Sequence, residues 1–453
     1  MERWVDSRVR QASFGGDRGD DRGGLTAMNK ADLTDAQRRV LEALDVTEIV
    51  DDVVSLVQVP SVTGTDAESE LQNTMAARLR ALGMDVDCWK LDLDELAADP
   101  EYPGVEAERV EGYGLVAESG GQGVPALVLQ GHIDVVPVGD LSSWGGREPF
   151  DGRVSGDTIF GRGTVDMKAG VAVNVAVAKA LLTSGVTLER PFAVHQVISE
   201  EDGGLGAFAT MRRGHRGEVA VITEPTSGRL VVANAGALTF TLRVPGLAAH
   251  GSTRLSGVSA LEVFWPLFAA MQELEAERNT HVDPLFADYE MPYGVSIGKV
   301  SAGDWSSSVP NLLVAEGRFG VILGEDVSDA RLALERTIAD AAAKHPWLRD
   351  HPPVIEWDGG QFASGRLAEG HPLIDEVADA VEAVTGARPD AGAAPYGSDL
   401  RLYTGIGGIP TLQFGPGDVR YAHAPREQVS IAEIERVAQA LAIMATARLG
   451  VHL

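Results

Sequence analysis

The chain has 453 residues, more than one ordinary domain holds, so we expect two domains. Hydrophobic residues make up 44% of the sequence, enough to fill sizeable cores, and no apolar run reaches the roughly 18 residues of a membrane span. The formal net charge of −28 argues against nucleic acid as a partner, because phosphates would be repelled.

Two local features of the sequence concern the cellular location of the protein. Residues 1–30 are rich in Arg, Asp and Gly and contain no apolar segment, so we expect a disordered tail and not a secretory signal. The single cysteine, Cys88, excludes an internal disulfide, and its strand-like context favours a buried thiol over a nucleophile. A cytoplasmic location fits this cysteine usage.

The first half of the chain alternates helices with short apolar strands. The expected helices cover 35–60, 67–83 and 168–185, and the expected strands cover 126–130, 192–198 and 219–222. This alternation predicts an α/β fold with a largely parallel sheet and helices on both faces. A polar cluster follows each strand, at the sheet edge where ligands bind in such folds. Residues 92–122, acidic and then Gly-rich, are expected to form an exposed excursion.

The pattern of expected strands and helices changes after residue 230. Strands are expected at 238–244, 294–300, 313–321 and 353–357, with helices at 258–277 and 326–344. The resulting order, strand–helix–strand–strand–helix–strand, is that of a ferredoxin-like α+β module. The first pattern then returns, with helices at 371–385 and 431–449 and a strand at 410–414. We therefore predict a catalytic domain formed by 31–232 and 361–453, with a domain at 233–360 inserted into it.

Five short stretches hold nearly all the residues that suggest chemistry: Gly131–Pro137, Gly161–Lys168, Ser199–Gly204, Thr223–Pro225 and Tyr421–Pro425. In the first of them, His132 and Asp134 stand two apart on an extended segment, so their side chains point the same way. A metal-bound imidazole needs a partner for its other ring nitrogen, and a carboxylate often supplies it.

Glu200 and Glu201 are adjacent carboxylates at a strand end, and two such groups in one site must differ in role or one is protonated. A cation resolves this conflict, since one glutamate can bind it while the other takes protons from water. Asp166, Glu224 and His423 stand on loops expected nearby. Two histidines and three carboxylates can hold two divalent ions, and such ligands suit zinc, cobalt or manganese. The competing interpretation is a purely structural α/β protein whose acidic loops are solvated turns.

The five stretches, in their order and spacing, resemble the di-zinc metallohydrolases that include acetylornithine deacetylase, succinyl-diaminopimelate desuccinylase, aminoacylase and glutamate carboxypeptidase. The resemblance runs from about residue 35 to the C-terminus. It implies that Asp166 bridges two Zn²⁺ ions and that Glu200 is the general base, with Asp134 orienting His132. The remaining ligands that it implies are His132 and Glu224 for one ion, and Glu201 and His423 for the other.

The resemblance also implies that the inserted domain is a lid through which two chains form a homodimer. His250 resembles the lid histidine of that family, which reaches a neighbouring subunit's active site and donates to the oxyanion. Ser307 stands where the family often has Asn, although Asn311 follows the proline, and Arg318 lies closer to that proline than the family's carboxylate-binding Arg. The candidate substrate-binding residues are therefore Arg318, Asn311, Ser307, Ser398 and Gly415.

The expected activity is a metal-dependent amidohydrolase that removes an acyl group from an N-acylated amino acid or a similar small amide. It would resemble acetylornithine deacetylase or succinyl-diaminopimelate desuccinylase. The alternatives are a dipeptidase or carboxypeptidase of the same family, a deformylase of a formylaminopyrimidine, and an inactive metal-binding relative. The acyl group cannot be read from the sequence, because specificity depends on lid and loop geometry.

Overall fold

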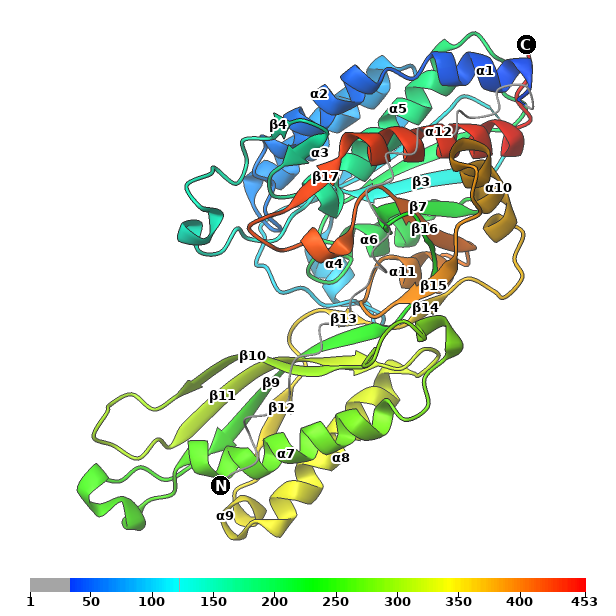
Figure 1. Ribbon diagram of the computed structural model, residues 1–453. Coiled ribbons are helices and arrows are strands. Elements are labelled where there is room, and N and C mark those ends of the chain that lie inside the picture. Colours follow the sequence, from blue (N-terminus) through cyan, green and yellow to red (C-terminus); the bar gives the residue numbers. More distant parts are fainter. Residues whose placement is uncertain (1–32, 122) are drawn as a thin grey trace, which may run out of the picture.

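The computed structural model describes residues 33–121 and 123–453 (Figure 1). A large sheet covered by helices lies at one end of the molecule, and a smaller sheet with two long helices lies at the other. The tail expected at 1–30 lies outside the described residues. No described helix is long and apolar enough to cross a membrane.

The large sheet has the mixed, largely parallel character that the sequence predicts. Within the described residues its strand order is β1-β2-β6-β3-β7-β16-β8-β14, and β15 pairs with β8. Its central strands β6, β3, β7 and β16 run parallel, while β1 and β2 are antiparallel at one edge. The strands are β1 (Asp85–Lys90), β2 (Tyr113–Glu118), β3 (Leu127–His132), β6 (Phe192–Val197), β7 (Ala220–Pro225), β8 (Leu230–Asn234), β14 (Gly365–Arg366), β15 (Ala391–Ala394) and β16 (Thr411–Gly415).

The prediction that residues 92–122 form an exposed excursion is wrong for the second half of this segment. Residues 113–118 form β2, which pairs with β1 on one side and β6 on the other and is buried along most of its length. The apolar side chains of Leu115 and Ala117 pack into the main core, which explains why this short stretch is drawn into the sheet.

Helices cover both faces of the large sheet. Apolar side chains from α1, α2, α3, α5, α10 and α12 form one core with it, and side chains from α6 and α11 form a second core on the opposite face. The helices are α1 (Asp35–Glu42), α2 (Val46–Val57), α3 (Asp66–Ala81), α5 (Ala169–Thr183), α6 (Leu205–Arg213), α10 (Leu373–Thr385), α11 (Leu400–Thr404) and α12 (Ile431–Arg448). Both faces are therefore closed to water, as parallel sheets require.

The single helix expected at 35–60 is two helices. Asp45 interrupts it, because its carboxylate accepts the backbone N–H groups of Thr47 and Glu48 and so caps a new helix start. Thr34 and Gln37 form a reciprocal cap at the start of α1.

The smaller sheet has the ferredoxin-like arrangement. The order β10-β11-β9-β12 is antiparallel throughout, and the helices α7 and α8 pack on it around one apolar core. Its elements are β9 (Gly236–Pro245), α7 (Ala260–Arg278), β10 (Val295–Ala302), β11 (Leu312–Val321), α8 (Val327–Lys344) and β12 (Val354–Glu356). The remaining short elements are α4 (Leu93–Ala97), β4 (Arg153–Ser155), β5 (Thr158–Phe160), α9 (Pro346–Asp350), β13 (Gln361–Phe362) and β17 (Gln428–Ser430). The domain boundaries at 232/233 and 360/361 stay a prediction.

A buried histidine in the large sheet makes stability depend on pH. His195 of β6 is fully buried, and its Nδ1 lies 2.9 Å from the Tyr403 hydroxyl. Burial, with a smaller contribution from His215, lowers the pKa of His195 to about 3. The unfolded chain takes up this proton near pH 6.5, so below that pH unfolding gains a proton and stability falls.

We therefore expect wild type to lose about 2 kcal/mol more unfolding free energy between pH 7 and pH 5 than His195→Gln, which cannot ionise. Denaturant unfolding at the two pH values measures this difference. Equal losses in the two proteins would show that His195 does not control the acid sensitivity.

Candidate active site

The predicted site residues stand at the carboxyl ends of neighbouring parallel strands. β3 ends at His132, the loop after β6 carries Glu200 and Glu201, and Glu224 lies near the end of β7. β3 pairs in parallel with both β6 and β7, so these three ends meet at one edge of the sheet. Asp166 enters from the turn Thr164–Lys168 that leads into α5, and the Asp166–Met167 peptide is cis.

His132 is fully buried, and both of its ring nitrogens have partners. Nδ1 lies 3.0 Å from the Asp134 backbone oxygen and 3.5 Å from the Asp134 carboxylate. A proton on Nδ1 leaves the Nε2 lone pair free, and Nε2 faces Asp166 at 3.1 Å and Glu224 at 3.5 Å.

The Asp134 carboxylate does more than orient His132. Its two oxygens accept the backbone N–H groups of Glu200 at 3.2 Å and Glu201 at 3.3 Å, and the Thr63 hydroxyl at 2.9 Å. Asp134 therefore ties the β3 end to the loop that carries both glutamates.

The two oxygens of Asp166 face different histidines. Oδ1 lies 3.1 Å from His132 Nε2, and Oδ2 lies 3.4 Å from His423 Nε2. His423 also lies 2.9 Å from Glu201 Oε2. Asp166 thus stands between two groups of donors, one on each side.

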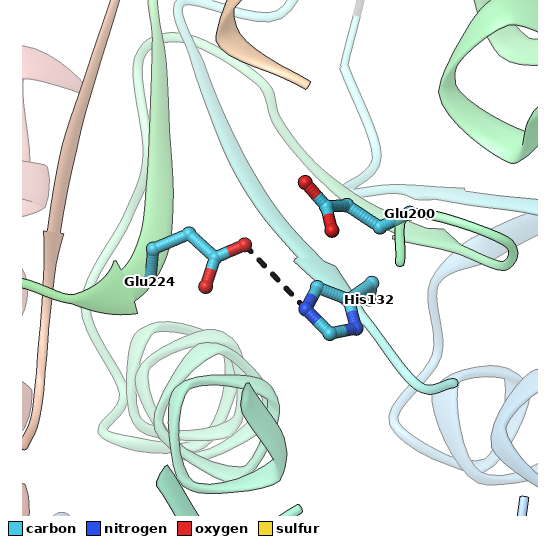
Figure 2. A group of neighbouring side chains, drawn as sticks. All are labelled: His132, Glu200 and Glu224. Atoms are coloured by element: carbon cyan, nitrogen blue, oxygen red, sulfur yellow. Dashed lines mark ion pairs between the residues drawn. The ribbon is translucent and has the colours of Figure 1, made fainter. Parts of the chain in front are cut away.

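Glu200 and Glu224 both lie beside His132, and the dashed line in Figure 2 marks the pair between His132 and Glu224. The donor atoms of His132, Glu200 and Glu224 lie within 4.8 Å of one another, as do those of His132, Asp166 and Glu201. The Glu200, Glu201 and Glu224 side chains are under 10% exposed, so they are not solvated turns.

The site concentrates negative charge in a buried place. Burial, and then the charge of Glu224, raises the pKa of Glu200 well above its usual range, and burial and Asp166 raise the pKa of Glu201 to about 7. Burial favours neutral His132, but Glu224 and the hydrogen bonds to Asp134 and Asp166 raise its pKa well above the usual value. Five carboxylates against two imidazoles call for added positive charge.

The donors present fit divalent cations. Imidazole nitrogen and carboxylate oxygen are the ligands that zinc and similar ions take in hydrolases. Nε2 of each histidine points at carboxylate oxygens, and Asp166 offers one oxygen to each group. These residues form a candidate metal site.

The lid residues of the prediction do not join this group within one chain. His250 Nδ1 contacts Ser252, and the segment around His250 pairs with the one around Ser308. Ser307 and Asn311 lie in that same exposed region, where their backbone oxygens accept the N–H groups of Gly251 and Gly246.

Three further predicted residues lie between the two sheets or behind the site. Arg318 of β11 in the smaller sheet donates a hydrogen bond to the backbone oxygen of Pro395, which directly follows β15 of the large sheet, at 2.9 Å. Ser398 is buried, with its hydroxyl 3.0 Å from Asn234 Oδ1. A Cβ added at Gly415 would lie 2.1 Å from the Thr223 oxygen, so that glycine permits close strand packing beside Glu224.

Sequence reasoning missed the residues that hold these loops. Glu427 pairs with Arg162, and its other oxygen accepts the backbone N–H groups of Val165 at 3.2 Å and Asp166 at 3.4 Å. The signal was present, because Arg162 lies in the same Gly-Arg-Gly stretch as Asp166 and Glu427 follows His423 by four positions. A second missed group, Glu68, Arg109 and Asp202, lies under the Glu200 loop.

The sequence is similar to known hydrolases over most of its length. It is 27% identical over 398 residues to N-formyl-4-amino-5-aminomethyl-2-methylpyrimidine deformylase of Halalkalibacterium halodurans, covering 82% of this chain and 87% of that protein. It is 26% identical over 387 residues to acetylornithine deacetylase of Erwinia tasmaniensis, covering 84% of this chain and 92% of that protein.

The fold is likewise that of known proteins. The dipeptidase Dug1p of Saccharomyces cerevisiae superposes with a TM-score of 0.72 at 13% identity, covering 91% of this chain and 98% of that chain. The model of peptidase family M20/M25/M40 matches residues 128–447, which contain every predicted metal ligand. The chain therefore belongs to peptidase family M20/M25/M40 and is a metal-dependent hydrolase of amide bonds.

Proposed function

We propose that the protein is a di-zinc amidohydrolase that removes an acyl group from an N-acylated amino acid or a similar small amide. The observation that carries the proposal is the placement of Asp166, whose two carboxylate oxygens face two different histidines. A single-ion site has no need of a carboxylate shared in this way.

The ligands fall into two groups around Asp166. His132 and Glu224 would hold one ion with Oδ1 of Asp166, and His423 and Glu201 would hold the other with Oδ2. Zinc fits this mixture of nitrogen and oxygen donors, and cobalt or manganese can replace it. When bound, the ions supply Lewis acidity toward the scissile carbonyl and make a water molecule acidic enough to be deprotonated near neutral pH.

Glu200 is the general base of the proposed reaction. Its carboxylate takes the proton of the attacking water and then hands it to the nitrogen of the leaving amine. Asp134 fixes the Glu200 backbone through its N–H group, at 3.2 Å.

The lid completes the site in a homodimer. His250 makes no described contact with the carboxylate cluster of its own chain, and it stands on an exposed loop with Ser307. We infer that His250 serves a neighbouring subunit's site, where its N–H donates to the oxyanion. One such donor stabilises the transition state by about 3 kcal/mol.

The substrate is a small amide with a carboxylate. Arg318 is the cation that reaches from the lid sheet toward the loop at Pro395, and a guanidinium suits carboxylate recognition. The relatives include both a deacetylase and a deformylase, so the acyl group distinguishes the leading proposal from the deformylase alternative. A dipeptidase or carboxypeptidase activity is the other alternative within the family. A cytoplasmic location stays a prediction.

A panel of N-acetyl, N-succinyl and N-formyl compounds and dipeptides, assayed with zinc or cobalt, tests the proposal. We expect the highest kcat/KM on an N-acylated amino acid, with dipeptides poorer by at least about tenfold, which corresponds to one or two lost contacts. Preferential cleavage of dipeptides would replace the deacylase proposal with the peptidase alternative. No cleavage of any member would contradict it.

A further inference from the structure

The residue before the proposed base has an unusual backbone conformation. Ser199 has φ of 59°, in the left-handed region that residues other than glycine rarely occupy. Two buried carboxylates hold it there, since Glu68 accepts the Ser199 N–H at 3.2 Å and Asp202 accepts the Ser199 hydroxyl. Because Ser199 directly precedes Glu200, its conformation sets where the base emerges from the chain.

Asp202 also holds a second segment, residues 103–109, which we call the strap. The other carboxylate oxygen of Asp202 accepts the N–H groups of Glu106 at 3.2 Å and Ala107 at 2.9 Å. Arg109 of the strap pairs with Glu68 at 2.9 Å and lies 3.9 Å from Asp202. These three charged side chains are at most 6% exposed, so their interactions are shielded from water.

The far side of the strap contacts two strands of the smaller sheet, β13 and β9. The Pro103 oxygen accepts the N–H of Gln361 at 2.8 Å, and Glu106 accepts the Thr239 hydroxyl of β9 at 2.7 Å. The strap therefore lies between the Glu200 loop and the start of the smaller sheet.

Glycines bring these backbones into direct contact. A Cβ at Gly203 would lie 2.1 Å from the Gly104 oxygen, and a Cβ at Gly104 would lie 2.3 Å from the Gly359 oxygen. Neither distance leaves room for a side chain, so a shift of one backbone moves the next.

We propose that Asp202 is a positioning residue that holds Glu200 in place by fixing Ser199 on one side and the strap on the other. This inference rests on the proposed function, in which Glu200 is the base. Among the described residues, Asp202 makes no hydrogen bond or ion pair with the side chain of a proposed metal ligand; its partners are Ser199, Glu106, Ala107 and Arg109. It acts through the backbone of the Glu200 loop and through the strap, which contacts both this loop and the smaller sheet.

The test compares Asp202→Asn with wild type in the zinc-loaded protein. Asparagine keeps one acceptor oxygen and replaces the other by an amide that cannot accept. We expect kcat to fall about 10- to 100-fold with KM within about threefold, because a small misplacement of a catalytic group costs this much. Zinc per chain stays unchanged, and hydrogen exchange at the amides of 199–204 becomes faster.

Two further variants keep the test decisive. Ser199→Ala removes only the hydroxyl that donates a hydrogen bond to Asp202, and it retains every charge. We expect it to lower kcat by a smaller factor than Asp202→Asn. This variant keeps the proposal testable if Asp202→Asn folds poorly. Asp157→Asn is the matched control, because Asp157 also accepts a serine hydroxyl, at 2.6 Å from Ser430, and a backbone N–H, at 3.1 Å from Ala432. It stands between β4 and β5, and its variant should keep wild-type kcat.

The two proposals fail separately. Wild-type kcat together with unchanged exchange at 199–204 in Asp202→Asn would overturn the positioning role. A kcat loss without faster exchange there would also overturn it. If wild type cleaves no substrate of the panel, the proposed function fails, and the exchange measurement still decides whether Asp202 holds the loop.

Discussion

Glu200→Gln is expected to lower kcat by about 10²- to 10⁴-fold while the protein keeps its full complement of metal, because a general base contributes this much and an amide cannot take a proton. Glutamine has nearly the same volume and keeps one acceptor oxygen beside His132 and Glu224. Burial of the side chain favours a neutral group, so the variant should fold at least as well as wild type. Steady-state kinetics and metal content per chain measure the two expectations.

Glu201→Gln is the contrasting variant. It removes one charge from the adjacent position, where the carboxylate lies 2.9 Å from His423. We expect it to lose about one zinc per chain, whereas Glu200→Gln loses none. The structure allows a different assignment, in which Glu200 joins His132 and Glu224 as a ligand. Loss of a metal ion from Glu200→Gln would support that assignment, and near-normal turnover would dismiss Glu200 as the base.

Asp166→Asn should abolish activity and weaken metal binding at both positions, since one carboxylate serves both histidine groups. An amide offers one neutral oxygen in place of two charged ones, so we expect affinity for zinc to fall at least about 100-fold, more than loss of an outer hydrogen bond costs. Calorimetric titration of the metal-free protein with zinc measures this loss, and it does so independently of catalysis.

Chelation provides the companion experiment. Wild type dialysed against a chelator should lose activity and regain it with zinc or cobalt, while Asp166→Asn should regain none. The Asp157→Asn variant should behave as wild type. If Asp166→Asn still binds two zinc ions with wild-type affinity, Asp166 does not bridge them.

The sequence predicted most of the fold because its signals are local. The expected helix at 168–185 is α5, and the expected strand at 126–130 lies within β3, except for its first residue. The break at Asp45 was missed because side-chain capping competes with a continuing helix, and β2 was missed because it is short and stands between an acidic stretch and a Gly-rich one.

The five metal-ligand candidates could be found from the sequence because each stands in a loop between predicted elements and their order matches a known family. The supports around them could not, because their partners are distant in the chain. Arg162 and Glu427 are 265 positions apart, and Asp202 is 95 positions from Ala107. No local pattern relates such residues, and only the folded backbone brings them together. The roles of His250, Ser307 and Asn311 depend on a second subunit and stay predictions.

Crystals of the zinc-loaded protein, examined by anomalous diffraction at the zinc edge, test the central claim most directly. We predict two zinc peaks per chain, one bound by His132 and Glu224 and the other by Glu201 and His423, with Asp166 between them at about 2.0–2.2 Å from each. A single peak held by His132, Glu200 and Glu224, or no peak at this edge of the sheet, would contradict the account.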